Sequence, residues 1–222
     1  MNYRTIDMTT YPRKEHFDHF RNMEYPFVTM TVQVDISDWI VRLKKAGYPL
    51  FLCFQYAVAQ AANKVPEFRQ RIVDDGIIEY EHCNPSYTVA LPDETYRYCM
   101  VNTNQPLKDY LEEAKIKQDK ALHAEHLEEE GEPMSHLFTS CVPWQDFTGG
   151  TMPYPDSHFS IPNVVWGKYK TEPYLALEDG KVVEKMKTTI PVVIFVNHAL
   201  IDGLHISKFY SNLDEELAKM EF

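Results

Sequence analysis

The feature that most constrains the fold is an apolar run that ends in a histidine and an aspartate–glycine pair, Pro191-Val-Val-Ile-Phe-Val-Asn-His-Ala-Leu-Ile-Asp-Gly203. This run is short, rich in Val and Ile, and opened by Pro191, so it predicts a strand buried within a sheet. After Gly203 the apolar residues recur every three or four positions, which is typical of one face of a helix. They are Ile206, Phe209, Tyr210, Leu213 and Leu217. With a length of 222 residues, this pattern suits an α/β domain.

His198 lies where the predicted strand breaks toward the helix, a place from which a side chain can reach into a cleft. Histidine has the side chain whose ordinary pKa lies nearest neutrality, so it can take up and return a proton at physiological pH. A lone histidine is more often a core residue bonded to a backbone carbonyl. Asp202 and Gly203 favour a functional role, because a buried carboxylate needs a partner and glycine permits a sharp turn or close approach to a ligand.

At this point the residues resemble a known family. The pattern His-x-x-x-Asp-Gly at the end of an apolar strand is the signature of the chloramphenicol acetyltransferases and of the dihydrolipoyl acyltransferase catalytic cores. Five further segments are similar to the first family, in that family's order: Tyr11-Pro-Arg-Lys-Glu-His-Phe17, Pro66-Glu-Phe-Arg69, Tyr87-Thr-Val89, Ser140-Cys-Val-Pro-Trp144 and Gly167-Lys-Tyr169. The resemblance covers nearly the whole chain. It implies a single acetyltransferase domain over residues 1–222, a two-layer α/β sandwich in which helices cover a mixed β-sheet.

The resemblance also implies a reaction, the transfer of an acetyl group from acetyl-CoA to a hydroxyl of chloramphenicol or a similar small molecule. His198 would be the general base, and Ser140 would donate a hydrogen bond to the oxyanion of the tetrahedral intermediate. Arg13 would pair with Asp202 and support the turn of the motif. Without the resemblance, Arg13 is typical of a solvated helix charge and Ser140 of a bonded strand hydroxyl.

Acetyl-CoA would be a co-substrate, with no permanently bound cofactor. The family suggests Tyr48, Lys168 and Tyr169 as its contacts, although Lys168 is equally compatible with a plain surface residue. Members of the family are homotrimers whose active sites lie between subunits, and many confer antibiotic resistance. Two departures concern the acceptor site, because Asn197 stands in place of a first histidine and Val165 in place of a threonine.

Composition excludes several classes of function. The net charge of −11 argues against non-specific nucleic-acid binding, which depends on Lys and Arg. Four scattered cysteines without CxxC spacing, no signal peptide and no apolar run of about 18 residues predict a cytoplasmic protein with no membrane segment. Two histidine pairs could chelate a metal. A surface or packing role is favoured for His16 and His19 and a solvated acidic face for His123 and His126, so no metal site is predicted.

The periodicity predicts the remaining elements approximately. Helices are expected over residues 12–23, 38–46, 50–63 and 105–130. Strands are expected over residues 27–36, 87–90, 96–101, 137–144 and 163–170, with hairpins across 74–76 and 178–180. Residues 145–162 are rich in Gly and Pro and predict an irregular loop that could shape a substrate pocket.

Two alternative functions remain at this stage. A dihydrolipoyl-type acyltransferase core is disfavoured, because no lipoyl or subunit-binding domain precedes residue 1 and the N-terminal segment is more similar to the first family. A non-catalytic trimer that binds an apolar ligand is disfavoured by the retention of His198, Asp202, Ser140 and Arg13.

Overall fold

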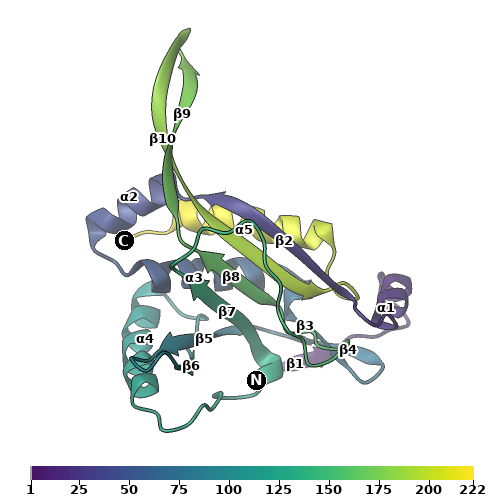
Figure 1. The fold of residues 1–222 in the computed structure, drawn as a ribbon. Helices are drawn as coiled ribbons and strands as arrows, with labels where there is room; N and C mark the ends of the chain where they lie inside the picture. Colours follow the sequence, from purple (N-terminus) through teal and green to yellow (C-terminus); the bar gives the residue numbers. More distant parts are fainter. Residues whose placement is uncertain (1) are drawn as a thin grey trace.

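The computed structural model describes residues 2–222, which form a large mixed β-sheet with helices packed against it and a separate three-stranded sheet (Figure 1). The helices are α1 (Lys14–Arg21), α2 (Ser37–Ala46), α3 (Leu50–Asn63), α4 (Leu107–Leu122) and α5 (Gly203–Lys219), with short 3₁₀ turns η1 (Pro66–Arg69) and η2 (Pro133–Ser135). The strands are β1 (Tyr3–Thr5), β2 (Phe27–Asp35), β3 (Gln70–Val73), β4 (Gly76–Tyr80), β5 (Asn84–Ala90), β6 (Tyr96–Met100), β7 (His136–Val142), β8 (Asn163–Gly167), β9 (Lys170–Glu178) and β10 (Lys181–Asn197).

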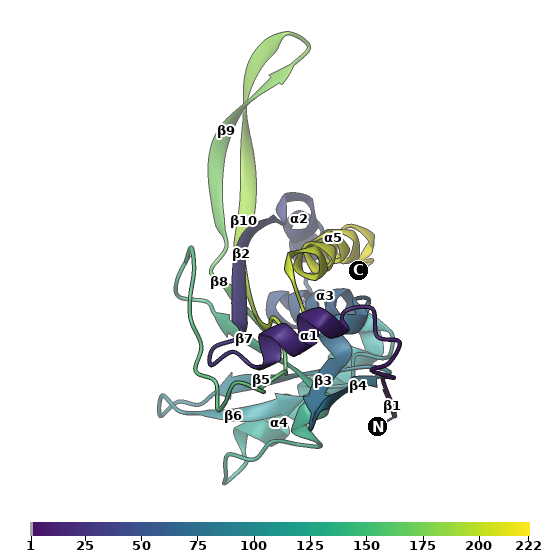
Figure 2. The same ribbon diagram turned by 90° about the vertical axis from the view of Figure 1, so that its right-hand side faces the viewer.

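The main sheet has the strand order β2-β10-β8-β7-β5-β6, and β9 pairs with the outer part of β10. The pairs β7–β8 and β5–β7 are parallel, whereas β10 is antiparallel to β2, β8 and β9. Helices α2, α3 and α5 lie on one side of this sheet, and the loop between β7 and β8 lies on the other (Figure 2). The predicted two-layer arrangement of helices on a mixed sheet is therefore observed.

The core lies between the sheet and its helices. Helix α3 is apolar nearly all round and buries nine of its side chains, which explains why its sequence shows little amphipathic period. All five apolar positions predicted for one face of α5 are buried. Within residues 2–222, no helix is both long and apolar enough to span a bilayer.

Strand β10 is longer than the sequence predicted. Pro191 does not open it; the strand begins at Lys181 and runs through Pro191 to Asn197. Proline has no N–H to donate, so it fits a central strand only where a ladder is interrupted. Such an interruption exists here, since the pairing with β9 stops at Thr189 and the pairing with β8 begins at Val192. Two elements that look separate in the sequence are therefore one strand.

Gly167 ends β8 beside this interruption. A Cβ atom at Gly167 would lie 2.6 Å from the carbonyl oxygen of Gln145 and 2.9 Å from Cγ of Pro191. Such contacts are too close for any larger residue, because the backbone oxygen cannot move aside. The glycine of the Gly-Lys-Tyr segment therefore lets the loop after β7 approach the end of β8.

Helix α4 is shorter than predicted, because it ends at Leu122 instead of residue 130. Three consecutive glutamates, residues 128–130, would lie near the negative end of the helix dipole, where acidic side chains are unfavourable. The predicted solvated acidic face is also partly wrong. Glu129 accepts a hydrogen bond from the Ser86 hydroxyl at 2.9 Å and lies 3.3 Å from Nδ1 of the fully buried His136. No group of three or more metal-ligating side chains occurs in the described chain.

Candidate active site

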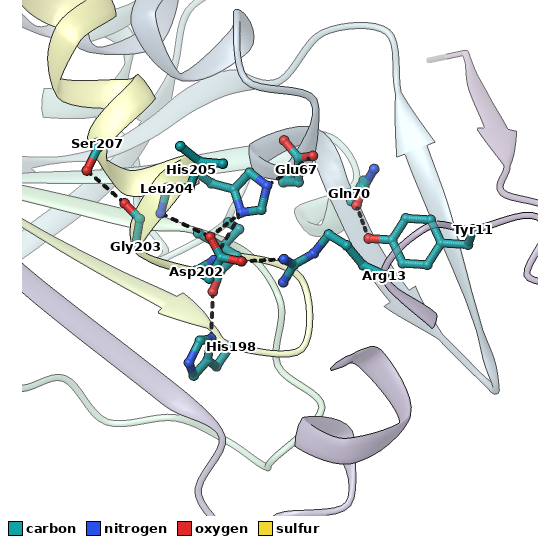
Figure 3. Close-up of polar contacts among 11 residues, drawn as sticks. Tyr11, Arg13, Glu67, Gln70, His198, Asp202, Gly203, Leu204, His205 and Ser207 are labelled. Atoms are coloured by element: carbon teal, nitrogen blue, oxygen red, sulfur yellow. Dashed lines mark hydrogen bonds and ion pairs between the residues drawn. The ribbon is translucent and has the colours of Figure 1, made fainter. Parts of the chain in front are cut away.

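His198 follows the last residue of β10, and three contacts hold its position. Its backbone N–H donates to the carbonyl of Pro26 at 2.7 Å, and its ring stacks on Phe20 with 4.0 Å between centroids. Nδ1 lies 3.0 Å from the carbonyl oxygen of Ile201, in the turn that the motif forms (Figure 3). Since a carbonyl only accepts, Nδ1 carries the proton, and Nε2 keeps the lone pair of a base.

Asp202 caps the N-terminus of α5 and forms an ion pair with Arg13 (Figure 3). Its Oδ1 accepts the backbone N–H of Leu204 at 3.0 Å, as an N-cap side chain does. Burial raises the pKa of the Asp202 carboxyl, but the hydrogen bond and charge of Arg13 and the nearby His205 outweigh it and hold the pKa below its usual value. Asp202 is therefore an anion at neutral pH, which fits a structural support for the turn.

Two residues near this turn were not singled out by sequence reasoning. His205 completes the capping box of α5, because its Nδ1 accepts the backbone N–H of Asp202 at 3.1 Å. Its Nε2 lies 3.3 Å from a carboxylate oxygen of Glu67 in η1. The signal available in the sequence was the N3 position of His205 after an Asp N-cap, a spacing that resembles a capping box.

The side chain of Asn197 forms hydrogen bonds that link the loop of residues 145–162 to the strand that leads to His198. This side chain is buried, and Nδ2 donates to the carbonyls of Ser157 at 3.0 Å and Phe159 at 3.1 Å. Its Oδ1 accepts the N–H of Ala199 at 3.0 Å. The departure noted in the sequence, asparagine in place of histidine, thus has a structural role in positioning the loop next to His198.

Aromatic side chains line the contact between this loop and β2. Tyr154 stacks on Phe27, with 3.6 Å between ring centroids and an interplanar angle of 2°. Tyr25 and Phe159 contact Tyr154 edge-on or at a tilt, with centroid distances of 6.2 and 5.8 Å. Burial is the main cause that raises the pKa of the Tyr154 hydroxyl. The loop therefore presents an apolar, aromatic surface at the end of the sheet where His198 lies.

Ser140 lies in β7, on the face of the sheet opposite the helices. The preceding residue, Thr139, faces α3, because its hydroxyl accepts a hydrogen bond from Gln55 at 3.0 Å. Side chains alternate along a strand, so Ser140 points to the other face, which carries the loop. The ring of Phe138 on that face is 6.2 Å from Phe159 of the loop.

The structure does not bring Ser140 and His198 together within one chain. Ser140 is in register with Val165 of β8, and Val165 with Val193 of β10, five residues before His198. Two strand spacings and five residues place the two Cα atoms roughly 20 Å apart. A single chain thus contains both residues but does not join them in one site.

The three candidate contacts for coenzyme A also lie far from His198. Tyr169 directly precedes Lys170, which pairs with Thr189, nine residues before His198 along β10 and therefore about 30 Å away. The ring of Tyr169 is 5.2 Å from the Lys44 ammonium at the end of α2. The side chain of Lys168 is exposed, and Tyr48 packs against Phe222 with 5.4 Å between ring centroids.

Comparisons with known proteins show the family of the chain. The family model described as chloramphenicol acetyltransferase matches residues 1–214. The chain belongs to the chloramphenicol acetyltransferase family. A chloramphenicol acetyltransferase of Clostridium perfringens is 31% identical over 221 residues, which cover 97% of this chain and 98% of the relative. One of Clostridioides difficile is 30% identical over 221 residues, with 97% and 96% covered.

Solved structures confirm the predicted fold class. A chloramphenicol acetyltransferase has a TM-score of 0.78 at 25% identity, with 97% of this chain and all of that chain covered. The cubic core of a pyruvate dehydrogenase multienzyme complex has a TM-score of 0.62 at 20% identity, covering 90% of this chain and 85% of that one, and shares the fold. Membership of this acetyltransferase family confirms the predicted class of enzyme, an acyltransferase.

Proposed function

We propose that this chain is an acetyl-CoA-dependent O-acetyltransferase, folded as one domain, that acetylates a hydroxyl of chloramphenicol or of a similar small molecule. The observation that carries the proposal is the tautomer of His198, in which Nε2 has no proton and keeps its lone pair. Its Nδ1 proton is held by the carbonyl of Ile201 at 3.0 Å, which leaves the opposite nitrogen unprotonated and available as a base. The family to which the chain belongs supports the acetyl donor.

The chemistry follows from these groups. Nε2 of His198 removes the proton of the acceptor hydroxyl while its oxygen attacks the thioester carbonyl of acetyl-CoA. The Ser140 hydroxyl donates a hydrogen bond to the oxyanion of the tetrahedral intermediate. The intermediate then collapses, the C–S bond breaks, and the thiolate of coenzyme A takes the proton from the His198 imidazolium. Both substrates react in one ternary complex, so no acyl-enzyme is required.

A homotrimer with sites between subunits reconciles this mechanism with the separation of its two catalytic residues. One chain would supply His198, and the neighbouring chain Ser140 with the coenzyme A contacts Tyr48, Lys168 and Tyr169. The hairpin of β9 and β10 supports assembly, because it projects beyond the rest of the chain (Figures 1 and 2). Several apolar side chains of this hairpin are each more than half exposed, which is unusual for a surface that stays free in solution. They are Leu175, Leu177, Val182 and Met186.

The direct test measures thiol release from acetyl-CoA by the purified protein. We expect release that depends on chloramphenicol or on another small aromatic alcohol, because an aromatic surface borders His198. Dihydrolipoamide serves as the comparison acceptor and tests the dihydrolipoyl-type alternative. If thiol is released with dihydrolipoamide but with no alcohol, the acceptor is a dithiol and the proposed acceptor class is wrong. If no thiol is released with any acceptor of a broad panel of alcohols, the enzymatic function is contradicted.

Mixed trimers test the site between subunits. Separately, His198→Ala lacks the base, and Ser140→Ala is expected to lose about 10²–10³-fold in kcat. If the two variants are refolded together in equal amounts, some sites combine an intact His198 from one chain with an intact Ser140 from its neighbour. Random assembly of a cyclic trimer makes this combination at about one quarter of the sites, so activity should recover to about one quarter of the wild-type value. Activity no higher than the sum of the separate variants would refute the shared site.

A further inference from the structure

A continuous chain of polar contacts links the proposed base to a partly buried carboxylate. Nδ1 of His198 bonds the carbonyl oxygen of Ile201 at 3.0 Å. The N–H of the same peptide group belongs to Asp202, and it donates to Nδ1 of His205 at 3.1 Å. Nε2 of His205 lies 3.3 Å from Oε1 of Glu67. The peptide group between Ile201 and Asp202 thus lies between two imidazole rings (Figure 3). Its oxygen accepts a hydrogen bond from His198, and its N–H donates one to His205.

The contacts assign the tautomer of His205. Nδ1 accepts the Asp202 N–H, so it carries no proton, and Nε2 carries the proton that faces Glu67. Burial raises the pKa of the Glu67 carboxyl, but the hydrogen bond from His205 and a backbone hydrogen bond, with smaller contributions from nearby charges such as Lys208, bring the pKa below its usual value. Glu67 is therefore an anion, which favours a proton on Nε2 of His205.

The alternative state of His205 would break the chain of contacts. Oδ1 of Asp202 lies 3.1 Å from the same Nδ1, so a proton on Nδ1 would be drawn to this oxygen and the Asp202 N–H would lose its acceptor. Arg13 already neutralises Asp202 through the other carboxylate oxygen, Oδ2. The charged groups around the imidazole are thus Glu67, Asp202 and, behind them, Arg13 and Lys208.

We propose that His205, oriented by Glu67, is a positioning residue for the general base, because it fixes and polarises the peptide group that holds His198. This inference rests on the proposed role of His198 as the base. A peptide group that donates at its nitrogen is a stronger acceptor at its oxygen, since linked hydrogen bonds polarise one another. Ile201 would then hold the Nδ1 proton of His198 more firmly, both before and after Nε2 takes the proton of the substrate.

A matched pair of variants separates this role from simple packing. In His205→Asn the amide oxygen can stand in for Nδ1 and accept the Asp202 N–H, while the contact with Glu67 is lost. In His205→Gln the amide nitrogen can stand in for Nε2 and donate to Glu67, while the Asp202 N–H loses its acceptor. His205 is 5% exposed, so both changes disturb the same buried site to a similar extent.

The first readout needs no turnover. Nitrogen NMR of the ¹⁵N-histidine-labelled protein without substrate reports which ring nitrogen of His198 carries the proton, with His198→Ala used to assign the signal. We expect the Nδ1–H tautomer in the wild type and in His205→Asn, and a mixture with the Nε2–H tautomer in His205→Gln. Equal tautomer populations in the two variants would overturn the proposal.

The second readout is kinetic. His205→Gln should lower kcat about tenfold and leave KM for acetyl-CoA within about twofold, while the acidic limb of its pH–rate profile moves to lower pH. His205→Asn should stay within about threefold of the wild type with an unchanged profile. Equal losses with unchanged profiles would mean a packing role only and would refute the inference.

The proposal stays testable if a variant fails to fold or if the wild-type protein is inactive. If His205→Gln does not fold, Glu67→Ala replaces it, because loss of the carboxylate releases the Nε2 proton of His205 and should raise the Nε2–H population of His198 in the same way. An unchanged tautomer in folded Glu67→Ala would then overturn the proposal. A wild-type protein that acetylates no acceptor would refute the proposed function, while the NMR result would still decide the role of His205.

Discussion

Replacing His198 by alanine is expected to lower kcat/KM for acceptor-dependent thiol release by at least about 10³-fold. The substitution removes Nε2 of His198, the nitrogen that we propose as the base. The remaining acceleration would come from substrate binding and from the Ser140 hydrogen bond alone. The fold should persist, because the side chain is only partly buried and its ring makes a single hydrogen bond, to the carbonyl of Ile201.

The matched control is His123→Ala. The side chain of His123 is 77% exposed at the end of α4, away from the contacts of His198, so this variant should keep wild-type kinetics. The two proteins are compared by steady-state thiol release and by circular dichroism. A His198→Ala protein that folds and retains more than about one tenth of the activity would show that another group accepts the proton.

Replacing Arg71 by methionine is expected to lower the free energy of unfolding by about 4 kcal/mol. Arg71 is fully buried, and its guanidinium donates to the carbonyls of Phe68, Gln70, Met134 and His136 at 2.6–2.9 Å. Each buried carbonyl left without a donor costs about 1–3 kcal/mol, and neighbouring losses add incompletely. Burial lowers the pKa of this guanidinium, and no ion pair of Arg71 occurs within residues 2–222.

The measurement is denaturant unfolding at one fixed protein concentration, since assembly would make stability depend on concentration. Arg4→Met is the matched control, because the Arg4 side chain is 72% exposed and its partner Glu79 keeps the hydrogen bond from Gln70 at 3.0 Å, so the loss should be about 1 kcal/mol or less. Arg71 also bonds the first residue of β7, so a partly folded variant should lose Ser140-dependent activity as well. Equal stability of the two variants would contradict the role assigned to Arg71.

Neither Arg71 nor Asn197 shows its role in the sequence. Arg71 stands in a short strand of mixed residues, and only the fold brings four carbonyls from η1, β3, η2 and β7 around its guanidinium. Asn197 looked like a change in the acceptor site, whereas its amide holds the carbonyls of Ser157 and Phe159. Local patterns do not report such contacts, because the partners lie up to 65 residues away along the chain.

The local elements of the site followed from sequence alone. The β-branched run before His198 is buried, the apolar stripe after Gly203 is one helix face, and Asp202 stands at the N-cap between them. These features depend on the period of a strand, the period of a helix and the preference of Asp for a helix N-terminus, which are properties of neighbouring residues. The resemblance to the family added Arg13 as the partner of Asp202, and the two form an ion pair.

Tertiary structure alone decided the rest. The register of β7, β8 and β10 sets Ser140 and His198 roughly 20 Å apart in one chain, and the passage of β10 through Pro191 depends on where β9 stops and β8 begins. The proton on Nδ1 of His198 depends on a carbonyl three residues away that a turn aims at the ring. Strand register and long-range partners arise from packing between distant segments, and the direction of the His198 hydrogen bond depends on the backbone path of the turn, so no local sequence pattern contains them.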